Sequence, residues 1–190
     1  MKTLFIINPI SGKGSKDKLI SRLDEMGFEY VVTSRAGEGE ELARKATQDV
    51  VVAVGGDGTL NEVGRGILGT GKILGIVPCG SGDGLARFLD IPHDVGKAVD
   101  VITAGKTIPL DAGLINGHPF FSVCGVGFDA NVSKAFAEAG RRGVLTYVEE
   151  ALRLWHNYSP EEFTIDIDGK KWTQEAVLVT VANSNQWGND

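Results

Sequence analysis

The fold of this chain is decided by residues 50–61, which read Val50-Val51-Val52-Ala53-Val54-Gly55-Gly56-Asp57-Gly58-Thr59-Leu60-Asn61. Five successive apolar residues are typical of a strand that is covered on both faces, as in a parallel sheet. Three glycines around one carboxylate follow, and then a helical pattern. Such a turn lets backbone N–H groups approach an anion, which the helix N-terminus also favours. The stretch predicts a phosphate-binding loop with a built-in acid, although a strand-to-helix turn without a ligand also uses glycine in this way.

Strands and helices alternate on both sides of this loop. The patterns predict strands over 3–8, 28–33 and 73–77 and helices over 15–26, 38–46 and 59–68. A second glycine-rich segment, Cys79–Gly84, opens a short helix over 85–89, and Asp94 is expected to cap a helix over 95–104. The alternation predicts an α/β domain with a doubly wound parallel sheet. Both glycine-rich segments are expected at its carboxyl edge, where open α/β sheets bind ligands.

The pattern changes after Gly105. Strand-like runs over 107–116 and 118–124 flank Asn116-Gly117, a frequent hairpin signal. Helices over 131–139 and 143–157 and strands over 163–168 and 171–182 are expected to follow. We therefore expect an α/β domain over 1–105 and a β-rich, sandwich-like second domain over 106–190, incomplete because the chain ends directly after a strand. Trp155 and Trp172 are expected to pack in its core.

The composition limits the class of protein. The chain has 190 residues, of which 42% are hydrophobic, and a net charge of −6, which argues against a nucleic-acid partner. Cys79 and Cys124 match neither a disulfide framework nor a metal-site spacing, which favours a reducing compartment. The N-terminus lacks a signal-peptide pattern, and no apolar run reaches the ~20 residues of a membrane span. We expect a cytoplasmic protein that at most touches a membrane surface.

Several segments together resemble the diacylglycerol kinase/sphingosine kinase family of lipid kinases, related more distantly to the NAD kinases. Residues 55–62 are similar to the GGDGT signature of that family, residues 8–12 to its first nucleotide loop, and residues 74–87 to its second loop. The second loop differs from that of the NAD kinases. The resemblance implies an NAD-kinase-like fold with ATP and Mg²⁺ as cofactors. It also implies phosphoryl transfer to a hydroxyl of a diacylglycerol- or sphingoid-type lipid.

The resemblance extends to individual site residues. Those expected to bind the nucleotide are Asn8, Pro9, Ser11, Gly12, Thr33, Gly55, Gly56, Asp57, Gly58, Thr59, Asn61, Gly80, Ser81 and Gly82. Asp57, the only carboxylate between glycines at the expected cleft, is the catalytic candidate, either as a ligand of magnesium and water or as the group that activates the acceptor hydroxyl. Asp57, Asp83 and Asp111 are the expected metal ligands. The family commonly has Gly-Thr-Gly-Asn-Asp in the second loop, so Gly84 replaces its aspartate, and we expect Asp83 to substitute for it.

Three alternatives stay open. An NAD kinase would share the fold but is disfavoured by residues 80–87. A non-catalytic nucleotide-binding regulatory module is compatible with Gly84, and the base proposed for the family lies beyond residue 190. A Rossmann-type oxidoreductase is disfavoured because the G-x-G-x-x-A pattern at 125–130 follows a hairpin rather than a first strand. The expected partners are a lipid substrate and a membrane surface in peripheral contact, with no nucleic acid and with a homodimer left open.

Overall fold

The computed structural model describes residues 1–12, 16–140 and 144–185. Contacts divide these residues into two compact units, which are Met1–Ser122 with the residues from Ala182 onward, and Val123–Val181. The division falls at Ser122 rather than at the expected residue 105. The reason is that the segment after Gly105 stays with the first unit, and its Phe121 lies in the core of that unit.

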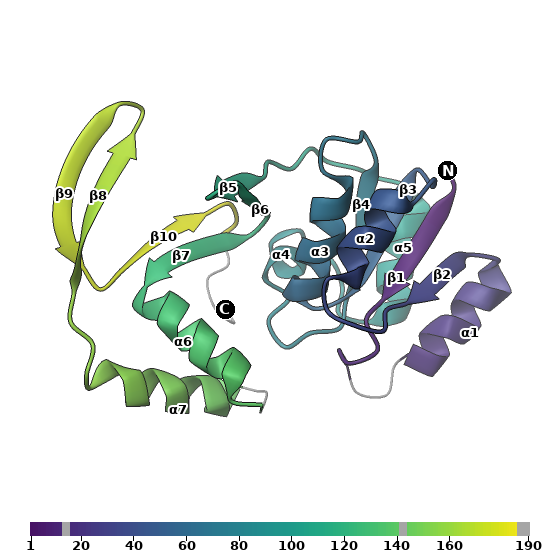
Figure 1. The fold of residues 1–190 in the computed structure, drawn as a ribbon. Helices are drawn as coiled ribbons and strands as arrows, with labels where there is room; N and C mark the ends of the chain where they lie inside the picture. Colours follow the sequence, from purple (N-terminus) through teal and green to yellow (C-terminus); the bar gives the residue numbers. More distant parts are fainter. Residues whose placement is uncertain (13–15, 141–143, 186–190) are drawn as a thin grey trace. The chain divides into compact units, whose positions relative to one another are not determined.

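A four-stranded parallel sheet forms the centre of the first unit (Figure 1). It consists of β1 (Thr3–Ile7), β2 (Glu29–Val32), β3 (Val50–Gly55) and β4 (Ile73–Pro78) in the order β2-β1-β3-β4. In the register, Phe5 of β1 lies opposite Tyr30 of β2 and Val52 of β3. The predicted α/β fold with a parallel sheet is confirmed.

Helices cover both faces of this sheet. Helices α1 (Lys16–Met26) and α5 (Val95–Ala104) pack on one face, against Phe5, Val52 and their neighbours. Helices α2 (Glu38–Lys45), α3 (Asp57–Ile67) and α4 (Gly84–Phe88) pack on the other, against Ile6, Val51 and Ala53. Successive residues of a strand point to opposite faces. The apolar run 50–54 lacks polar alternation because each of its faces meets its own core.

Helix ends follow local chemistry. Asp94 precedes α5 and accepts a hydrogen bond from the backbone N–H of Lys97 at 2.9 Å, as expected for a cap, and Gly105 ends the helix with φ 68°. Helix α3 begins at Asp57, two residues earlier than expected. The acid of the signature therefore lies in the first turn of a helix rather than in the preceding loop.

The segment after α5 is less regular than the sequence indicates. Strand structure is limited to β5 (Gly113–Ile115) and β6 (His118–Phe120), so the expected strand over 107–116 is shorter. The turn between them has positive φ at Asn116 (49°) and Gly117 (79°), as a two-residue hairpin of this type requires. The hairpin prediction is confirmed.

The second unit contains two helices and two pairs of strands. Its elements are β7 (Val123–Gly127), α6 (Phe128–Glu138), α7 (Val144–Trp155), β8 (Glu161–Ile167), β9 (Lys170–Ala176) and β10 (Leu178–Ala182). The expected strand over 171–182 is divided at Val177, because β9 pairs with β8 whereas β10 pairs with β7. Trp155 and Trp172 are exposed, so their expected burial is wrong. No helix in the described part of the chain is long and apolar enough to span a membrane.

Candidate nucleotide site

Two glycine-rich loops meet at the carboxyl edge of the sheet. The first loop, by which we mean Gly55–Gly58, runs from the end of β3 into the first turn of α3, and the second loop (Gly80–Gly84) joins β4 to α4. A Cβ atom placed on Gly80 would lie only 2.7 Å from the Cα of Gly56. A Cβ on Gly55 would lie 2.3 Å from the Oγ1 of Thr59. These glycines are required because the two backbones touch and the Thr59 side chain fills the remaining space.

The loop after β1 (Asn8–Gly12, the β1 loop) is tied to the first glycine-rich loop. The Asn8 Nδ2 donates to the Oγ1 of Thr59 at 2.9 Å, and the Asn8 Oδ1 accepts from the backbone N–H of Ile10 at 2.9 Å. The Ser11 hydroxyl donates to the carbonyl of Asn8 at 3.2 Å. Three of the predicted nucleotide-binding segments therefore lie together. The hydrogen bond between Asn8 and Thr59, which are 51 residues apart in the sequence, holds the β1 loop against the first loop.

Thr33 lies at the end of β2, beside β1. Both its backbone N–H and its hydroxyl donate to the carbonyl of Ile7, at 2.9 and 3.4 Å. Its side chain is buried. The hydroxyl proton is thus used within the sheet, and the oxygen keeps acceptor capacity.

Asp57 is the carboxylate of the first loop, and one of its oxygens has no partner. Its Oδ1 is buried without a hydrogen bond among the described residues, and the Oδ1 of Asn61 is in the same condition. Residues four apart on a helix lie on the same face, so both oxygens belong to one side of α3. A buried acceptor without a partner is costly. The arrangement suits a ligand that brings a donor or a cation.

Asp83 is the carboxylate of the second loop, and its two oxygens are occupied. The backbone N–H of Gly80 donates to Oδ2 at 2.9 Å and to Oδ1 at 3.1 Å, and the Nε2 of His93 lies 3.5 Å from Oδ2. Asp83 has φ 52°, which turns its side chain back on its own loop. Burial, and then the negative charge of Asp57, raise the pKa of the Asp83 carboxyl above its usual value. The negative charge of Asp57 therefore disfavours a second negative charge on Asp83.

Arg87 of α4 also holds the shape of the second loop. The Nε of Arg87 donates to the carbonyl of Gly82 at 2.9 Å. A cavity of about 960 Å³ borders this loop and the β1 loop, with Gly12, Gly80 and His93 in its lining together with Lys18 and Arg22 of α1. The lining also includes the carboxylates of Asp17, Glu25 and Asp94, so the space beside the loops carries charges of both signs.

Asp111 lies in the crossover segment before β5 and is exposed. Its carbonyl accepts a hydrogen bond from the Nδ2 of Asn183 at 2.6 Å, and the same amide group donates to the carbonyl of Phe121 at 3.0 Å. Within residues 1–12, 16–140 and 144–185, no group of three or more His, Cys, Asp or Glu side chains is placed to hold a metal ion. The structure brings Asp57 and Asp83 together but does not assemble a cluster of three carboxylates with Asp111.

Two residues important for the site geometry were not found by sequence reasoning. The carboxylate of Glu62 accepts hydrogen bonds from the backbone N–H groups of Gly37 (2.9 Å) and Gly39 (3.1 Å), and these hydrogen bonds fix the start of α2. Asn183 joins Asp111 to Phe121, as described above. Glu62 closes the signature stretch, five residues after Asp57, and could have been noticed at that position. Asn183 lies in a segment, residues 181–188, that resembles one of the family, but its contacts carry no local signal because its partners are 62 and 72 residues away.

The fold and the loops define a class of protein, namely an α/β protein with glycine-rich loops and a helix N-terminus suited to phosphate. The diacylglycerol kinase catalytic domain model matches residues 2–115, and the YegS C-terminal NAD kinase beta sandwich-like domain model matches residues 122–190. This chain belongs to the diacylglycerol kinase catalytic domain family.

Named relatives agree with this assignment. The chain is 31% identical to a diacylglycerol kinase of Bacillus subtilis (strain 168), with 96% of this chain and 65% of the relative aligned. It is 31% identical to a diacylglycerol kinase of Staphylococcus aureus (strain MRSA252), with 95% and 61% aligned. The crystal structure of a diacylglycerol kinase from Bacillus anthracis str. Sterne superposes with a TM-score of 0.76 at 27% identity, covering 97% of this chain and 65% of that one. The chain thus spans somewhat less than two thirds of the length of these relatives.

Proposed function

We propose that this chain provides the nucleotide-binding part, and a portion of the second domain, of a lipid kinase that uses ATP and Mg²⁺. The acceptor would be a hydroxyl of a diacylglycerol- or sphingoid-type lipid. The observation that carries the proposal is the unpaired, buried Oδ1 of Asp57 in the first turn of α3, beside two glycine-rich loops. The family assignment and the names of the relatives support it.

The loops would bind the phosphates through backbone groups. The first N–H groups of a helix lack intrahelical partners, and the N-cap of α3 is Gly56, which offers no side chain to satisfy them. An anion at this position gains the partial positive charge of the helix end. Gly55, Gly56, Gly58 and Thr59, with the β1 loop and residues 80–82, would together surround the phosphate chain. This role follows from their being held in contact by the Asn8–Thr59 hydrogen bond and the Gly56–Gly80 approach.

The oxygen atoms at the site fit magnesium. This ion prefers carboxylate and carbonyl oxygen ligands, and the unpaired oxygens of Asp57 and Asn61 are of that kind. Asp57 would hold the ion, with Asp83 and Asp111 as further candidates, and the bound ion would neutralise charge on the phosphate oxygens. Of the two candidates, Asp83 already accepts the Gly80 N–H and would have to release it, at least in part, to reach an ion.

Asp57 has a second possible role in phosphoryl transfer. A carboxylate that accepts the proton of the attacking hydroxyl or orients that hydroxyl would serve the same reaction. In this role the unpaired Oδ1 would accept a hydrogen bond from the lipid hydroxyl. The two roles predict different responses to metal, since only a ligand role makes the apparent affinity for Mg²⁺ depend on the Asp57 side chain.

The second unit would meet the lipid. Helix α7 exposes a stripe of apolar side chains at helical spacing, which includes Leu145 (81% exposed), Leu152 (68%) and Trp155 (57%). An apolar helix face with a tryptophan is suited to the boundary of a bilayer. We therefore propose peripheral contact with a membrane surface. Cys79 and Cys124 are not joined in a disulfide, which is compatible with a location in the cytoplasm, and a homodimer is a further proposal.

The proposal is tested by the transfer of labelled γ-phosphate from ATP. The protein as expressed from its gene is incubated with Mg²⁺ and, in parallel, with diacylglycerol, ceramide, sphingosine or NAD, and the Asp57→Asn variant serves as the matched control. Label in one lipid that the variant fails to produce supports the proposal and names the acceptor. Label in NAD alone would assign an NAD kinase activity instead. ATP binding without label in any acceptor would favour a regulatory module.

A further inference from the structure

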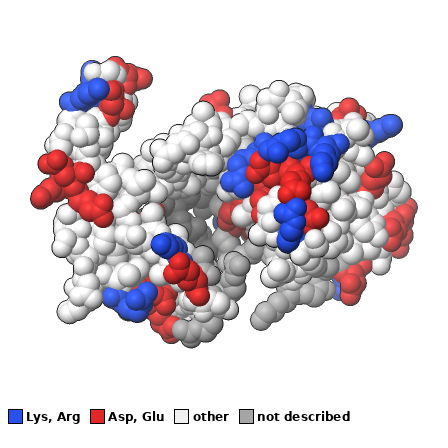
Figure 2. Space-filling view, viewed as in Figure 1, with Lys and Arg blue, Asp and Glu red and all other residues white. Residues whose placement is uncertain are grey.

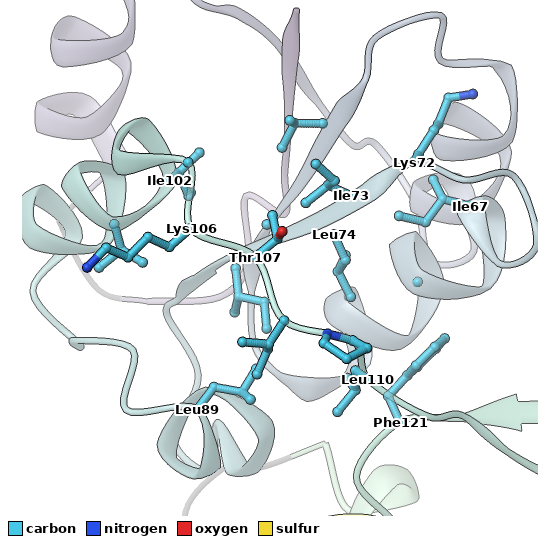
Figure 3. Close-up of a pocket in the computed structure, with 18 of the residues that line it drawn as sticks. Ile67, Lys72, Ile73, Leu74, Leu89, Ile102, Lys106, Thr107, Leu110 and Phe121 are labelled. Atoms are coloured by element: carbon cyan, nitrogen blue, oxygen red, sulfur yellow. The ribbon is translucent and has the colours of Figure 1, made fainter. Parts of the chain in front are cut away.

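A further cavity of the first unit lies beside strand β4, apart from the glycine-rich loops. It has a volume of about 710 Å³, and its mainly apolar lining includes Leu74, Leu110 and Phe121. Figure 3 shows Lys72 and Lys106 at the edge of this space with their ammonium groups directed away from it. Its described lining includes no residue of either glycine-rich loop. The chemistry of phosphate binding therefore depends on the loops themselves.

Asp83 is a buried carboxylate at the place where the two glycine-rich loops touch. Only 3% of its surface is exposed, and both its oxygens accept the backbone N–H of Gly80. A Cβ atom on Gly80 would lie 2.6 Å from the Oδ1 of Asp83, and a Cβ atom on Gly56 would lie 3.7 Å from the same oxygen. The carboxylate thus lies beside Gly56, the N-cap of α3, where the partial positive charge of a helix end favours an anion.

In this position Asp83 takes up a donor that a phosphate would use. Backbone N–H groups of glycine-rich loops donate to bound phosphates. The N–H of Gly80 carries a single hydrogen, which the two oxygens of Asp83 already share. A phosphate at the second loop must therefore either displace the carboxylate from this N–H or bind beside a second negative charge.

The surroundings of Asp83 disfavour further negative charge. Burial and the charge of Asp57 raise the pKa of the Asp83 carboxyl, and they outweigh the hydrogen bond from Gly80 and the charges of His93 and Arg87, which act in the opposite direction. A free polyphosphate would add its own negative charge to that of the two carboxylates. A polyphosphate that carries a divalent cation has a smaller negative charge, and its cation attracts both carboxylates.

We propose that Asp83 is an internal anion that makes nucleotide binding by this chain depend on a divalent cation. It occupies the N–H of Gly80 and repels a free polyphosphate, and the cation of a metal–nucleotide complex offsets this repulsion. The inference rests on the proposed function, because it concerns the same nucleotide site. It differs from a role of Asp83 as a metal ligand, because the carboxylate stays on Gly80 and determines which form of the nucleotide binds.

The proposal is tested by calorimetric titration of the whole protein with ADP, with excess Mg²⁺ or with a chelator, at one mildly alkaline pH. Asp83→Asn removes the charge, whereas asparagine keeps an acceptor for Gly80 and tolerates the left-handed conformation. This variant should bind free ADP at least about tenfold more tightly than the unaltered chain, and the magnesium complex with less than about a threefold change. Inorganic tripolyphosphate without Mg²⁺ should show the same gain, because the repulsion acts on the phosphates.

Asp90→Asn is the matched control. Asp90 also has a left-handed backbone (φ 54°), but it is exposed, so that water and salt screen its charge. This variant should bind both forms of ADP as the unaltered chain does. Asp83→Gly, which fits the conformation and leaves the N–H of Gly80 free, should bind free ADP at least as tightly as Asp83→Asn. Urea unfolding of each variant checks its fold.

The possible outcomes separate this inference from the proposed function. Unchanged binding of free ADP in both Asp83 variants, or an equal gain in Asp90→Asn, would overturn the inference. Weaker binding of the magnesium complex in Asp83→Asn would also overturn it and make Asp83 a metal ligand instead. If no variant and not the unaltered chain bound either form of ADP, the proposed function would be refuted, and this inference with it.

Discussion

The two glycine-rich loops have similar compositions and use their carboxylates in opposite ways. Asp57 lies inside the first turn of α3, and its Oδ1 has no partner among the described residues. Asp83 precedes α4 in a left-handed conformation, and both its oxygens accept the N–H of Gly80. A helical residue directs its side chain outward from the helix, whereas a left-handed residue before a helix can return its side chain to its own loop. The same residue type therefore gives one acid available to a ligand and one that stabilises the loop.

The largest effect is expected from removing the available charge. Asp57→Asn keeps the size of the side chain, so the free energy of unfolding should change little, but phosphoryl transfer should fall by at least about 100-fold, whether Asp57 acts as a base or as a metal ligand. The measurement is kcat with saturating ATP and lipid, together with the Mg²⁺ dependence. Turnover equal to that of the unaltered protein would contradict the role assigned to Asp57.

The contact between the two loops can be broken at Gly80. In Gly80→Ala the new Cβ would lie 2.7 Å from the Cα of Gly56 and 2.6 Å from the Oδ1 of Asp83. Because a backbone atom cannot move aside, the free energy of unfolding should fall by about 1–3 kcal/mol. Urea unfolding measures it. Gly58→Ala is the matched control, since nothing lies within 4 Å of its Cβ, and it should unfold at equal or higher urea concentration.

The anchoring role of Asp83 is sharpened by a pair of variants. Asp83→Ala leaves the N–H of Gly80 without its acceptor and places alanine at φ 52°, so stability should fall by about 1–3 kcal/mol. Asp83→Asn keeps an acceptor oxygen, and asparagine tolerates this backbone conformation. It should therefore be close to the unaltered chain in urea unfolding. If both variants lose the same stability, the hydrogen bond to Gly80 is not the reason.

The pH dependence of stability follows from the raised pKa of Asp83. The folded chain keeps a proton on this carboxyl at pH values where the unfolded chain, with a pKa of about 3.9, has lost it. The stability that this proton contributes is present below the unfolded pKa and is lost as the pH rises to the raised pKa. As the pH rises above the unfolded pKa of about 3.9, the unaltered chain should lose stability relative to Asp83→Asn. Urea unfolding at several pH values measures this, and parallel curves would contradict it.

The smallest change in the free energy of unfolding is expected at a third carboxylate, that of Glu62, which like Asp83 accepts backbone N–H groups. Glu62→Ala removes the acceptor of the Gly37 and Gly39 N–H groups at the start of α2, at a cost of about 1–2 kcal/mol. Thermal unfolding checks this value. The control is Glu41→Ala in α2, which removes only an exposed ion pair with Arg35 and should change the free energy of unfolding by less than about 0.5 kcal/mol. Equal effects of both variants would show that Glu62 does not fix the helix.

The surface over α2 and α3 carries charged side chains of both signs. On the face shown in Figure 2, Lys and Arg are mixed with Asp and Glu over α2 and α3. There Glu40 pairs with both Arg44 and Arg65. Glu40 and Arg44 have the spacing of four residues that places two side chains on one face of a helix. Glu41, on the same helix as Glu40, pairs with Arg35.

The regular part of the fold could be predicted because its signals are local. The run Val50–Val54 indicates a doubly covered strand, and Asp94 and Gly105 mark the ends of α5 by cap chemistry. Prediction was weaker after Gly105. Residues 107–112 are extended in pattern but form no strand, and the run 171–182 changes partner at Val177. Strand length and partner depend on which other strand lies alongside, and a single segment does not encode that.

By itself, the sequence determined the parallel α/β architecture, the two glycine-rich loops and the resemblance to a lipid-kinase family, since these follow from periodicity and from residue types at short spacing. The tertiary structure alone decided which carboxylate is available and which is used internally. It also placed the Glu62 carboxylate against the backbone N–H of Gly37 and joined Asn183 to Asp111. The Glu62 and Asn183 contacts join residues 25 and 72 positions apart, and the packing of whole elements sets their geometry. The internal use of Asp83 depends instead on the backbone conformation that returns its carboxylate to Gly80, three residues away.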